Sequence, residues 1–509
     1  MLSSVLERVA AAVLLAAVPW PVFGPVVSRQ FWQVFPKAGQ LLAVLLAGYT
    51  AGLILIAIAA PQWGIRLLCA VAVAMLAATH WHTRQGRGRR RQWPPGSLRP
   101  FALEPWFDRN FFLRQYQHLG SPFKSAQFVR PMACLVGLDE GLEFFREHEP
   151  SLSSPPLPFG RFIPGGFLRH MAPERHTTTK AMFRKALVGE VYEPLEHFIR
   201  VHIRAELASM AQASIASGTA GIPPRRHLQR LVFVLWARLF FNIEPASSDF
   251  NRLRSLFKVI DIRNPTGASD ATIRAALAGI RQLLRQQLTE QHAADSGRPR
   301  SFLEALDRYC PGSVYDPMVI GNLIYLMHTT WSDISGLFQW LMRMLTENPA
   351  WAARLRLPGN TADTGESTRL PLPTRVVMET LRLEQSEYLY RVVIQDIAHK
   401  DFVIPRGWLV RLCVQESHRD PAVFDDPQAF DPDRFLNRIF TRRQYSPFGA
   451  GLRHTCLGEK LTMTVGRIFV EELTVGYKWK TMADGPHEFS GWRHWRPSSR
   501  WRVLLEPVS

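Results

Sequence analysis

Apolar and polar residues divide the chain into three regions. The longest apolar stretches lie near the start, and residues 41–60 include no charged side chain. From residue 98 to about residue 360, apolar positions recur at intervals of three and four, as in 195–214, which predicts a helical body. After Arg382, short runs such as 409–414 alternate with turn signals and predict strands. The pattern therefore predicts a mainly α protein with a small β subdomain.

The apolar region at the start predicts transmembrane helices. Residues 41–60 have about the length that a helix needs to cross the hydrocarbon core of a bilayer. The stretch 10–27 is interrupted by prolines and 67–81 is short, so either one spans the membrane, re-enters it or lies at its interface. Two or three spans follow from this pattern. A cleaved signal peptide is disfavoured, because the strongest run begins some forty residues into the chain.

A basic flank follows the apolar region, formed by Arg84, Arg87, Arg89, Arg90 and Arg91. Short basic flanks of membrane spans tend to stay on the cytoplasmic side. We therefore expect a membrane protein, multi-pass or anchored, whose folded body faces the cytoplasm, at the endoplasmic reticulum if the source is eukaryotic. The alternative for this run is a solvated tail or a nucleic-acid patch.

Prolines and a glycine at 94–97 then predict a stiff hinge. The expected divisions are an N-terminal membrane-anchoring region over 1–93, the proline-rich hinge over 94–97 and one folded domain over 98–509.

Composition narrows the kind of protein. Forty-seven per cent hydrophobic residues, with 15 Trp and 31 Phe, predict a packed body, since disordered chains are poor in aromatic residues. The net charge of +18 suits nucleic acid, anionic lipid or an acidic protein. Because the basic run lies beside apolar segments, we expect its partner to be a lipid membrane and not nucleic acid. Five cysteines without CxxC spacing argue against a zinc site and a disulfide framework, and favour a reducing compartment.

The candidate chemistry lies in PFGAGLRHTCLGEKL, residues 447–461. Glycines let the backbone approach a flat cofactor, and backbone amides together with the start of a following helix stabilise a thiolate. These are the needs of a cysteine that binds a metal, here Cys456. The alternative for a lone cysteine in a tight turn is a buried structural residue.

This loop resembles the heme-binding signature of the cytochrome P450 family, Phe-x-x-Gly-x-Arg-x-Cys-x-Gly, with Phe448, Gly451, Cys456 and Gly458 in the matching positions. The resemblance extends over roughly residues 98–509. It implies the cytochrome P450 fold and a heme b cofactor, iron protoporphyrin IX, with Cys456 as the axial thiolate ligand of the metal.

The loop departs from the family pattern by one extra residue before its cysteine. Arg453 therefore lies three positions before Cys456 rather than two, unless His454 takes its role. We expect the loop to bulge, and we rank His454 above Arg391 as a contact of a heme propionate.

APERHTTTKAMFRKAL resembles the family's helix in which a histidine and a basic residue bind the heme propionates, here His176 and Lys180. Their spacing of four places both on one helix face. Without the resemblance, a solvated basic face explains this spacing equally well.

METLRL and FDPDRF supply the family's buried charge cluster, Glu379, Arg382 and Arg434. A carboxylate and a guanidinium three residues apart share a helix face and can pair. An exposed helix pair is the usual explanation for such a spacing, but the third member at the expected distance before Cys456 makes the set specific.

For oxygen chemistry, the matching segment is NLIYLMHTTWSDISGLFQWL, in which Thr329 takes the place of the family's alcohol and His328 that of its acid. A histidine there is similar to the sterol 14α-demethylase branch, and a histidine can relay protons near neutral pH. Tyr325 and Leu326 replace the small residues of the family. An ordinary polar pair in a buried helix is the alternative.

The resemblance implies a monooxygenase that inserts one oxygen atom from O2 into a hydrophobic small molecule, which is a secondary metabolite, terpenoid, sterol or lipid. Electrons come indirectly from NADPH through a redox partner, a cytochrome P450 reductase or a ferredoxin. Arg442, Arg443 and Lys460 are candidates for docking it. The extra loop residue and Tyr325 leave other functions open: a heme-thiolate isomerase or peroxide-using enzyme, or a catalytically silent membrane scaffold.

Overall fold

The computed structural model describes residues 92–98, 108–127, 130–154, 162–163, 166–168, 171–187, 189–260, 268–293, 298–357, 370–384, 389–436, 438–449, 455–489 and 494–508, with a few positions between 48 and 73. The chain folds as two compact units. The first comprises Met1–Ser153 and Leu389–Glu416, and the second comprises Ser154–Tyr388 and Ser417–Ser509.

The first unit is built on a five-stranded sheet of order β1-β2-β7-β4-β3, in which β2 and β7 are parallel and the other neighbours antiparallel. The sheet strands are β1 (Phe123–Gln127), β2 (Arg130–Leu135), β3 (Leu152–Ser153), β4 (Leu389–Val393) and β7 (Leu409–Leu412). The unit also contains α7 (Phe111–Leu119), α8 (Leu138–Glu147), the hairpin of β5 (Ile397–His399) and β6 (Phe402–Ile404), and the start of α19 (Val414–Ser417).

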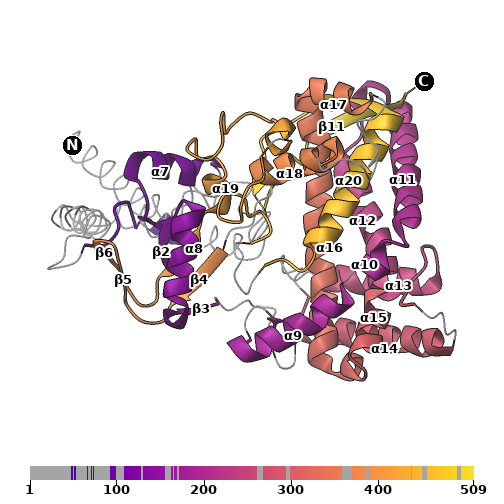
Figure 1. The fold of residues 1–509 in the computed structure, drawn as a ribbon, viewed down its shortest axis with the longest axis horizontal. Coiled ribbons are helices and arrows are strands. Elements are labelled where there is room, and N and C mark those ends of the chain that lie inside the picture. Colours follow the sequence, from indigo (N-terminus) through magenta and orange to yellow (C-terminus); the bar gives the residue numbers. More distant parts are fainter. Residues whose placement is uncertain are drawn as a thin grey trace. The chain divides into compact units, whose positions relative to one another are not determined.

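The second unit is mostly helical, and its helices are labelled in Figure 1. They are α9 (Pro173–Ala186), α10 (Gly189–Tyr192), α11 (Glu196–Ser217), α12 (Pro224–Phe241), α13 (Ser248–Val259), α14 (Asp270–Ala293), α15 (Phe302–Tyr309), α16 (Pro317–Glu347), α17 (Pro349–Leu355), α18 (Leu372–Glu384) and α20 (Glu459–Gly476). Two strand pairs complete it, β8 (Tyr477–Ala483) with β11 (Arg502–Pro507), and β9 (Glu488–Phe489) with β10 (Trp495–Arg496).

Helix α16 organises the core of the second unit. It is 31 residues long, begins at Pro317 with the Asp316 side chain accepting a hydrogen bond from Met318 N, and buries side chains on most of its circumference. A helix that is apolar almost all round has to lie inside a protein, and α16 packs against α12, α18 and α20. Phe338 of α16 stacks on Phe469 of α20 at 4.2 Å between ring centroids.

The predicted class is confirmed, because the described chain is mainly helical with small sheets. The helix predicted over 195–214 corresponds to α11, and the strand predicted over 409–414 corresponds to β7. No helix among the described residues is long and apolar enough to cross a membrane. The predicted spans within 1–93 lie almost entirely outside the described residues, so these spans stay a prediction.

Candidate functional site

Cys456 lies in the second unit, three residues before α20 begins. Of the four cysteines that the structure describes, it alone is exposed. Its backbone N–H donates to the carbonyl oxygen of Phe448 at 2.8 Å, and Gly449 has a φ of +88°, a value that glycine adopts without strain. The thiol of Cys456 is therefore exposed beside the positive end of an 18-residue helix.

Helix α9 meets this loop through Lys180. Its Nζ donates to the carbonyl oxygen of Thr455 at 2.8 Å, so the two predicted elements lie together. Burial and the neighbouring Arg184 lower the pKa of Lys180 to about 8, while the Cys456 thiolate opposes this shift. His176, one turn earlier, is buried as well.

Four other predicted residues are not placed beside Cys456. Gly451, Arg453 and His454 lie outside the described residues. Arg391 lies in β4 of the first unit, where its guanidinium donates to its neighbour's carbonyl oxygen, Tyr390 O, at 2.7 Å. Their predicted contacts with heme propionates stay predictions.

The structure brings the predicted charge cluster together inside the second unit. Glu379 and Arg382 on α18 are fully buried and form two hydrogen bonds, Nε to Oε2 at 2.7 Å and Nη2 to Oε1 at 2.8 Å. Arg434 Nε reaches Glu379 Oε1 at 2.9 Å. Arg382 also donates to carbonyl oxygens of His418, Pro427 and Ala429, so it holds the segment that precedes the cysteine loop.

His418 is a residue whose side-chain role the sequence analysis missed. Its Nε2 accepts a hydrogen bond from Ser446 N at 2.9 Å, ten residues before Cys456. Burial, and then the charge of Arg382, lower the pKa of His418 to about 3, so the ring is neutral and able to accept. Tyr445 stacks on it at 5.2 Å and donates to Met378 O of α18. In the sequence, His418 opens HRDP, residues 418–421, where Asp and Pro suit a turn but nothing points to this contact.

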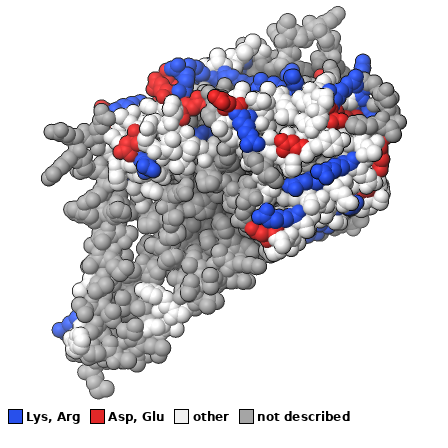
Figure 2. Space-filling view, turned by 90° about the horizontal axis from the view of Figure 1, so that it is seen from below, with Lys and Arg blue, Asp and Glu red and all other residues white. Residues whose placement is uncertain are grey.

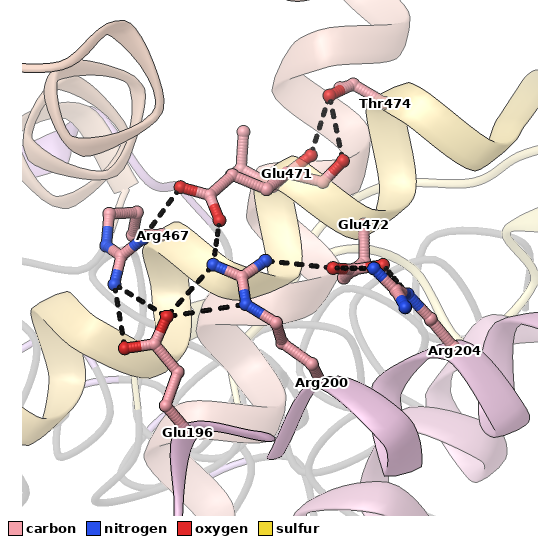
Figure 3. A network of polar contacts seen from close by, with 8 residues as sticks. Glu196, Arg200, Arg204, Arg467, Glu471, Glu472 and Thr474 are labelled. Carbon is pink, nitrogen blue, oxygen red and sulfur yellow. Dashed lines mark hydrogen bonds and ion pairs between the residues drawn. The ribbon is translucent and has the colours of Figure 1, made fainter. Parts of the chain in front are cut away.

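Helix α20 is fixed on α11 by a second network, drawn in Figure 3. Arg200 of α11 reaches Glu471 at 2.6 Å and Glu472 at 2.9 Å, both buried residues of α20. Arg467 joins Glu471 at 2.9 Å, and Arg204 binds Glu472 as well. Spacings of four, such as Arg467 to Glu471, are visible in the sequence, but the contacts between the two helices are not.

His328 and Thr329 of α16, the two residues predicted to serve the oxygen chemistry, have different surroundings. His328 is buried and its ring lies parallel to that of Phe257 of α13, at 6.3 Å, and edge-on to Trp331 at 6.1 Å. Thr329 is also buried, and its hydroxyl donates to Leu326 O of its own helix at 3.1 Å. Neighbouring helix residues point about 100° apart, because a turn takes about 3.6 residues.

Thr329 shares a helix face with two residues that hold the segment 162–168. Asn322 accepts from Leu168 N at 2.8 Å and donates to Gly166 O at 3.2 Å. Tyr325 meets Phe167 at 3.8 Å between ring centroids. The residues 166–168 therefore contact the face of α16 that carries Asn322 and Tyr325, the face that Thr329 shares.

These residues fit a heme. An exposed thiol is the protein ligand that heme iron accepts in its thiolate form, and Lys180 beside it provides a cation for an acidic substituent.

Comparison with known proteins agrees with this geometry. A family model described as cytochrome P450 matches residues 338–494, which include Glu379 and Cys456. The chain is 24% identical over 440 residues to abscisic acid 8'-hydroxylase 2 of Arabidopsis thaliana, covering 80% of this chain and 87% of that protein. It is 23% identical over 471 residues to cytochrome P450 87A3 of Oryza sativa subsp. japonica, covering 84% and 89%.

Other alignments are partial. One with abscisic acid 8'-hydroxylase CYP707A1 of Solanum lycopersicum, at 26% identity, covers 42% of this chain and 47% of that protein. Among solved structures, retinoic acid-bound cyanobacterial CYP120A1 matches with a TM-score of 0.65 and 21% identity, over 82% of this chain and 100% of that one. This likeness shows the fold.

Proposed function

We propose that this chain, whose residues 338–494 match a family model described as cytochrome P450, is a heme-thiolate monooxygenase of that family with Cys456 as the axial ligand. The observation that carries the proposal is the exposed thiol of Cys456 at the start of α20, in a loop that Lys180 contacts. Bound heme supplies the redox chemistry that activates dioxygen. The product gains one oxygen atom on a hydrophobic small molecule.

The chain's own residues hold the cofactor. The positive end of α20 favours the thiolate form of the Cys456 sulfur. Lys180 and His176, on one face of α9, are the residues we assign to the acidic side groups of the porphyrin. Arg453, His454 and Arg391 are further candidates for the same role.

Thr329 is the residue we propose for proton delivery on the other side of the cofactor. Its hydroxyl is bonded to the helix carbonyl of Leu326 and is able to swing to a nearby acceptor. For His328 we propose the acid's role that the resemblance implies, but the aromatic rings of Phe257 and Trp331 enclose its imidazole. The relatives reported above are not named as sterol demethylases, so His328 carries no substrate assignment.

For the substrate we propose a hydrophobic small molecule, such as a secondary metabolite, terpenoid, sterol or lipid. Names of the relatives suggest the first compounds to screen, abscisic acid and retinoic acid. The face of Thr329 and Tyr325, covered by the segment 162–168, is our candidate for the pocket wall.

Electrons are proposed to come from NADPH through a reductase or a ferredoxin. Of the three cations predicted to dock it, Arg442 forms two hydrogen bonds with the Glu459 carboxylate, at 2.8 and 2.9 Å. Its charge is therefore largely balanced by that carboxylate, and we propose that Arg442, Arg443 and Lys460 together take part in docking. Turnover that needs no reduced nicotinamide and reductase would favour the isomerase or peroxide-using alternative.

Membrane attachment through residues 1–93 is also part of the proposal. It rests on the apolar stretch 41–60 and the arginines that follow the apolar region.

The deciding experiment is the absorption spectrum of the reduced, carbon-monoxide-bound protein. Wild type is expected to give the red-shifted band of a thiolate-bound heme, and Cys456→Ser is expected to lose it. Cys310→Ser is the matched control, since this half-buried thiol follows α15 and has no role in the site. A protein that takes up no heme during expression with ample heme would contradict the proposal and favour the scaffold.

A further inference from the structure

His418 connects the buried charge cluster to the segment that leads to Cys456. Its carbonyl oxygen accepts a hydrogen bond from Nη1 of Arg382 at 2.7 Å, and its ring nitrogen Nε2 accepts one from Ser446 N at 2.9 Å. His418 and Ser446 are both fully buried. A single residue therefore contacts both the ion pair of α18 and the backbone ten residues before the cysteine.

Ser446 begins the turn that supplies the hydrogen-bond acceptor of the cysteine backbone. Its carbonyl oxygen accepts from Gly449 N at 3.3 Å, which closes the turn. Phe448 lies inside this turn, and its carbonyl oxygen accepts from Cys456 N at 2.8 Å. Because a displaced turn would displace the Phe448 carbonyl, the contact at Ser446 N sets where the Cys456 backbone is held.

The ring of His418 is in the protonation state that this contact needs. Burial, and then the charge of Arg382, lower the pKa of His418 to about 3, so the ring is neutral and one of its nitrogens carries no proton. A hydrogen bond between the ring and the Arg382 backbone opposes this shift, since it favours a proton on the ring. Nε2 is the nitrogen left to accept from Ser446 N.

Packing keeps water away from the contact between His418 and Ser446. Tyr445 stacks on the His418 ring at 5.2 Å between centroids, and its hydroxyl donates to Met378 O of α18 at 2.9 Å. Figure 2 shows Lys, Arg, Asp and Glu side chains on the surface, where water can take the place of a lost partner. Water has no such access to Ser446. Loss of the ring therefore leaves a buried N–H without its acceptor and favours movement of the turn.

We propose that His418 is a positioning residue for Cys456. Its backbone is held by Arg382, its ring holds Ser446 N, and the turn that starts there holds the cysteine backbone through Phe448. The buried charge cluster thereby fixes the place of the thiol beside the start of α20. This inference rests on the proposed function, because the sulfur that His418 positions is the proposed ligand of the heme iron.

Three substitutions of His418 separate the acceptor from the size of the side chain. His418→Leu removes the acceptor. His418→Gln places an amide oxygen near the position of Nε2 and should restore the contact, whereas the shorter His418→Asn should fall short of Ser446 N. Ser214→Ala is the matched control, because Ser214 Oγ accepts from Leu505 N at 2.7 Å at another fully buried place in the second unit.

The first measurement is hydrogen–deuterium exchange of the full-length protein, with mass spectrometry of peptides that contain Ser446 and Cys456. It needs no heme. We expect His418→Leu and His418→Asn to exchange there about fivefold faster or more than wild type, and His418→Gln to exchange at close to the wild-type rate. Ser214→Ala should raise exchange near Leu505 and leave these peptides unchanged.

Unchanged exchange of these peptides in His418→Leu, or an equal rise in Ser214→Ala, overturns the proposal. If His418→Leu fails to fold, the comparison of His418→Asn with His418→Gln decides in the same way, because these two side chains differ by one methylene group.

The second measurement follows the thiolate band of the reduced, carbon-monoxide-bound heme during urea unfolding, together with tryptophan fluorescence. His418→Leu should lose the band at a lower urea concentration, relative to the fluorescence change, than wild type does, while Ser214→Ala shifts both midpoints together. Both midpoints moving together in His418→Leu would indicate a structural role only and overturn the proposal. A wild type without heme would overturn the proposed function, and the exchange result would still decide whether His418 holds the turn.

Discussion

Glu379 is fully buried and forms ion pairs with both Arg382 and Arg434. We expect Glu379→Gln to lower the free energy of unfolding by about 3 to 5 kcal/mol, because removing one partner leaves buried guanidiniums uncompensated. Urea unfolding measures this. Glu244→Gln is the control. Glu244 pairs with Arg238 but its side chain is 62% exposed, so the free energy of unfolding should change by less than about 1 kcal/mol. Equal effects of the two variants would contradict the burial argument.

The lowered pKa of Lys180 predicts how the protein's stability and its heme affinity depend on pH. Its pKa in the folded protein is about 8, below its ordinary value of 10.5. Without a bound anion, the charged form is therefore disfavoured on folding, and Lys180 makes the protein more stable as pH rises from about 8 toward 10.5. An acidic group of the cofactor needs the charged form, so heme affinity should fall as pH rises above about 8, by at most about tenfold per pH unit.

Heme transfer to an acceptor protein at several pH values measures this dependence. Lys180→Arg should remove it, because a guanidinium stays charged over the whole range. Lys180→Met should bind heme more weakly at pH 7 and show no such dependence above pH 8. A wild-type affinity that stays constant to pH 10 would rule out Lys180 as a partner of the acidic groups.

At the scale of elements, α20 connects the cysteine loop to the body of the second unit. Burial opposes the charge of Arg200, but the hydrogen bonds that Arg200 donates to Glu471 and Glu472 raise its pKa above the ordinary value. We expect Arg200→Gln to loosen α20, because it leaves two buried carboxylates with fewer donors. The measurement is the fraction of reduced, carbon-monoxide-bound heme that shows the thiolate band, which should decrease.

Arg204→Gln is the matched control for α20. Arg204 binds the same Glu472, but 65% of its side chain is exposed, so its loss should change the thiolate fraction little. A smaller loss of the band in Arg200→Gln than in Arg204→Gln would show that the buried ion pairs do not position the loop.

At the scale of the whole molecule, the first ninety-three residues are proposed to hold the folded body at a membrane. Deleting 1–93 should move the protein from the membrane pellet to the supernatant after ultracentrifugation, because the apolar stretch 41–60 supplies most of the attachment. A high-salt wash of the pellet releases truncated protein that is held only by its basic surface, because salt screens this attraction. Full retention of the truncated protein in the pellet would mean that another surface also binds lipid.

The sequence by itself determined what depends on spacing along the chain. Helical periodicity predicted α11, the family resemblance predicted the helix of His328 and Thr329, and turn signals predicted the strand β7. The order of motifs pointed to Cys456, to α9 and to the pair of Glu379 and Arg382, because each is a local pattern of three or four residues. The contacts among Glu379, Arg382 and Arg434 are as expected.

Tertiary structure alone decided what depends on partners far along the chain. His418 supports the backbone at Ser446 and Arg200 holds α20, through contacts 28 and 271 residues apart in sequence. The burial of His328 among aromatic rings was equally invisible to periodicity. Burial sets the energy of a charge or a donor, and burial is a property of packing between distant segments, which spacing does not encode.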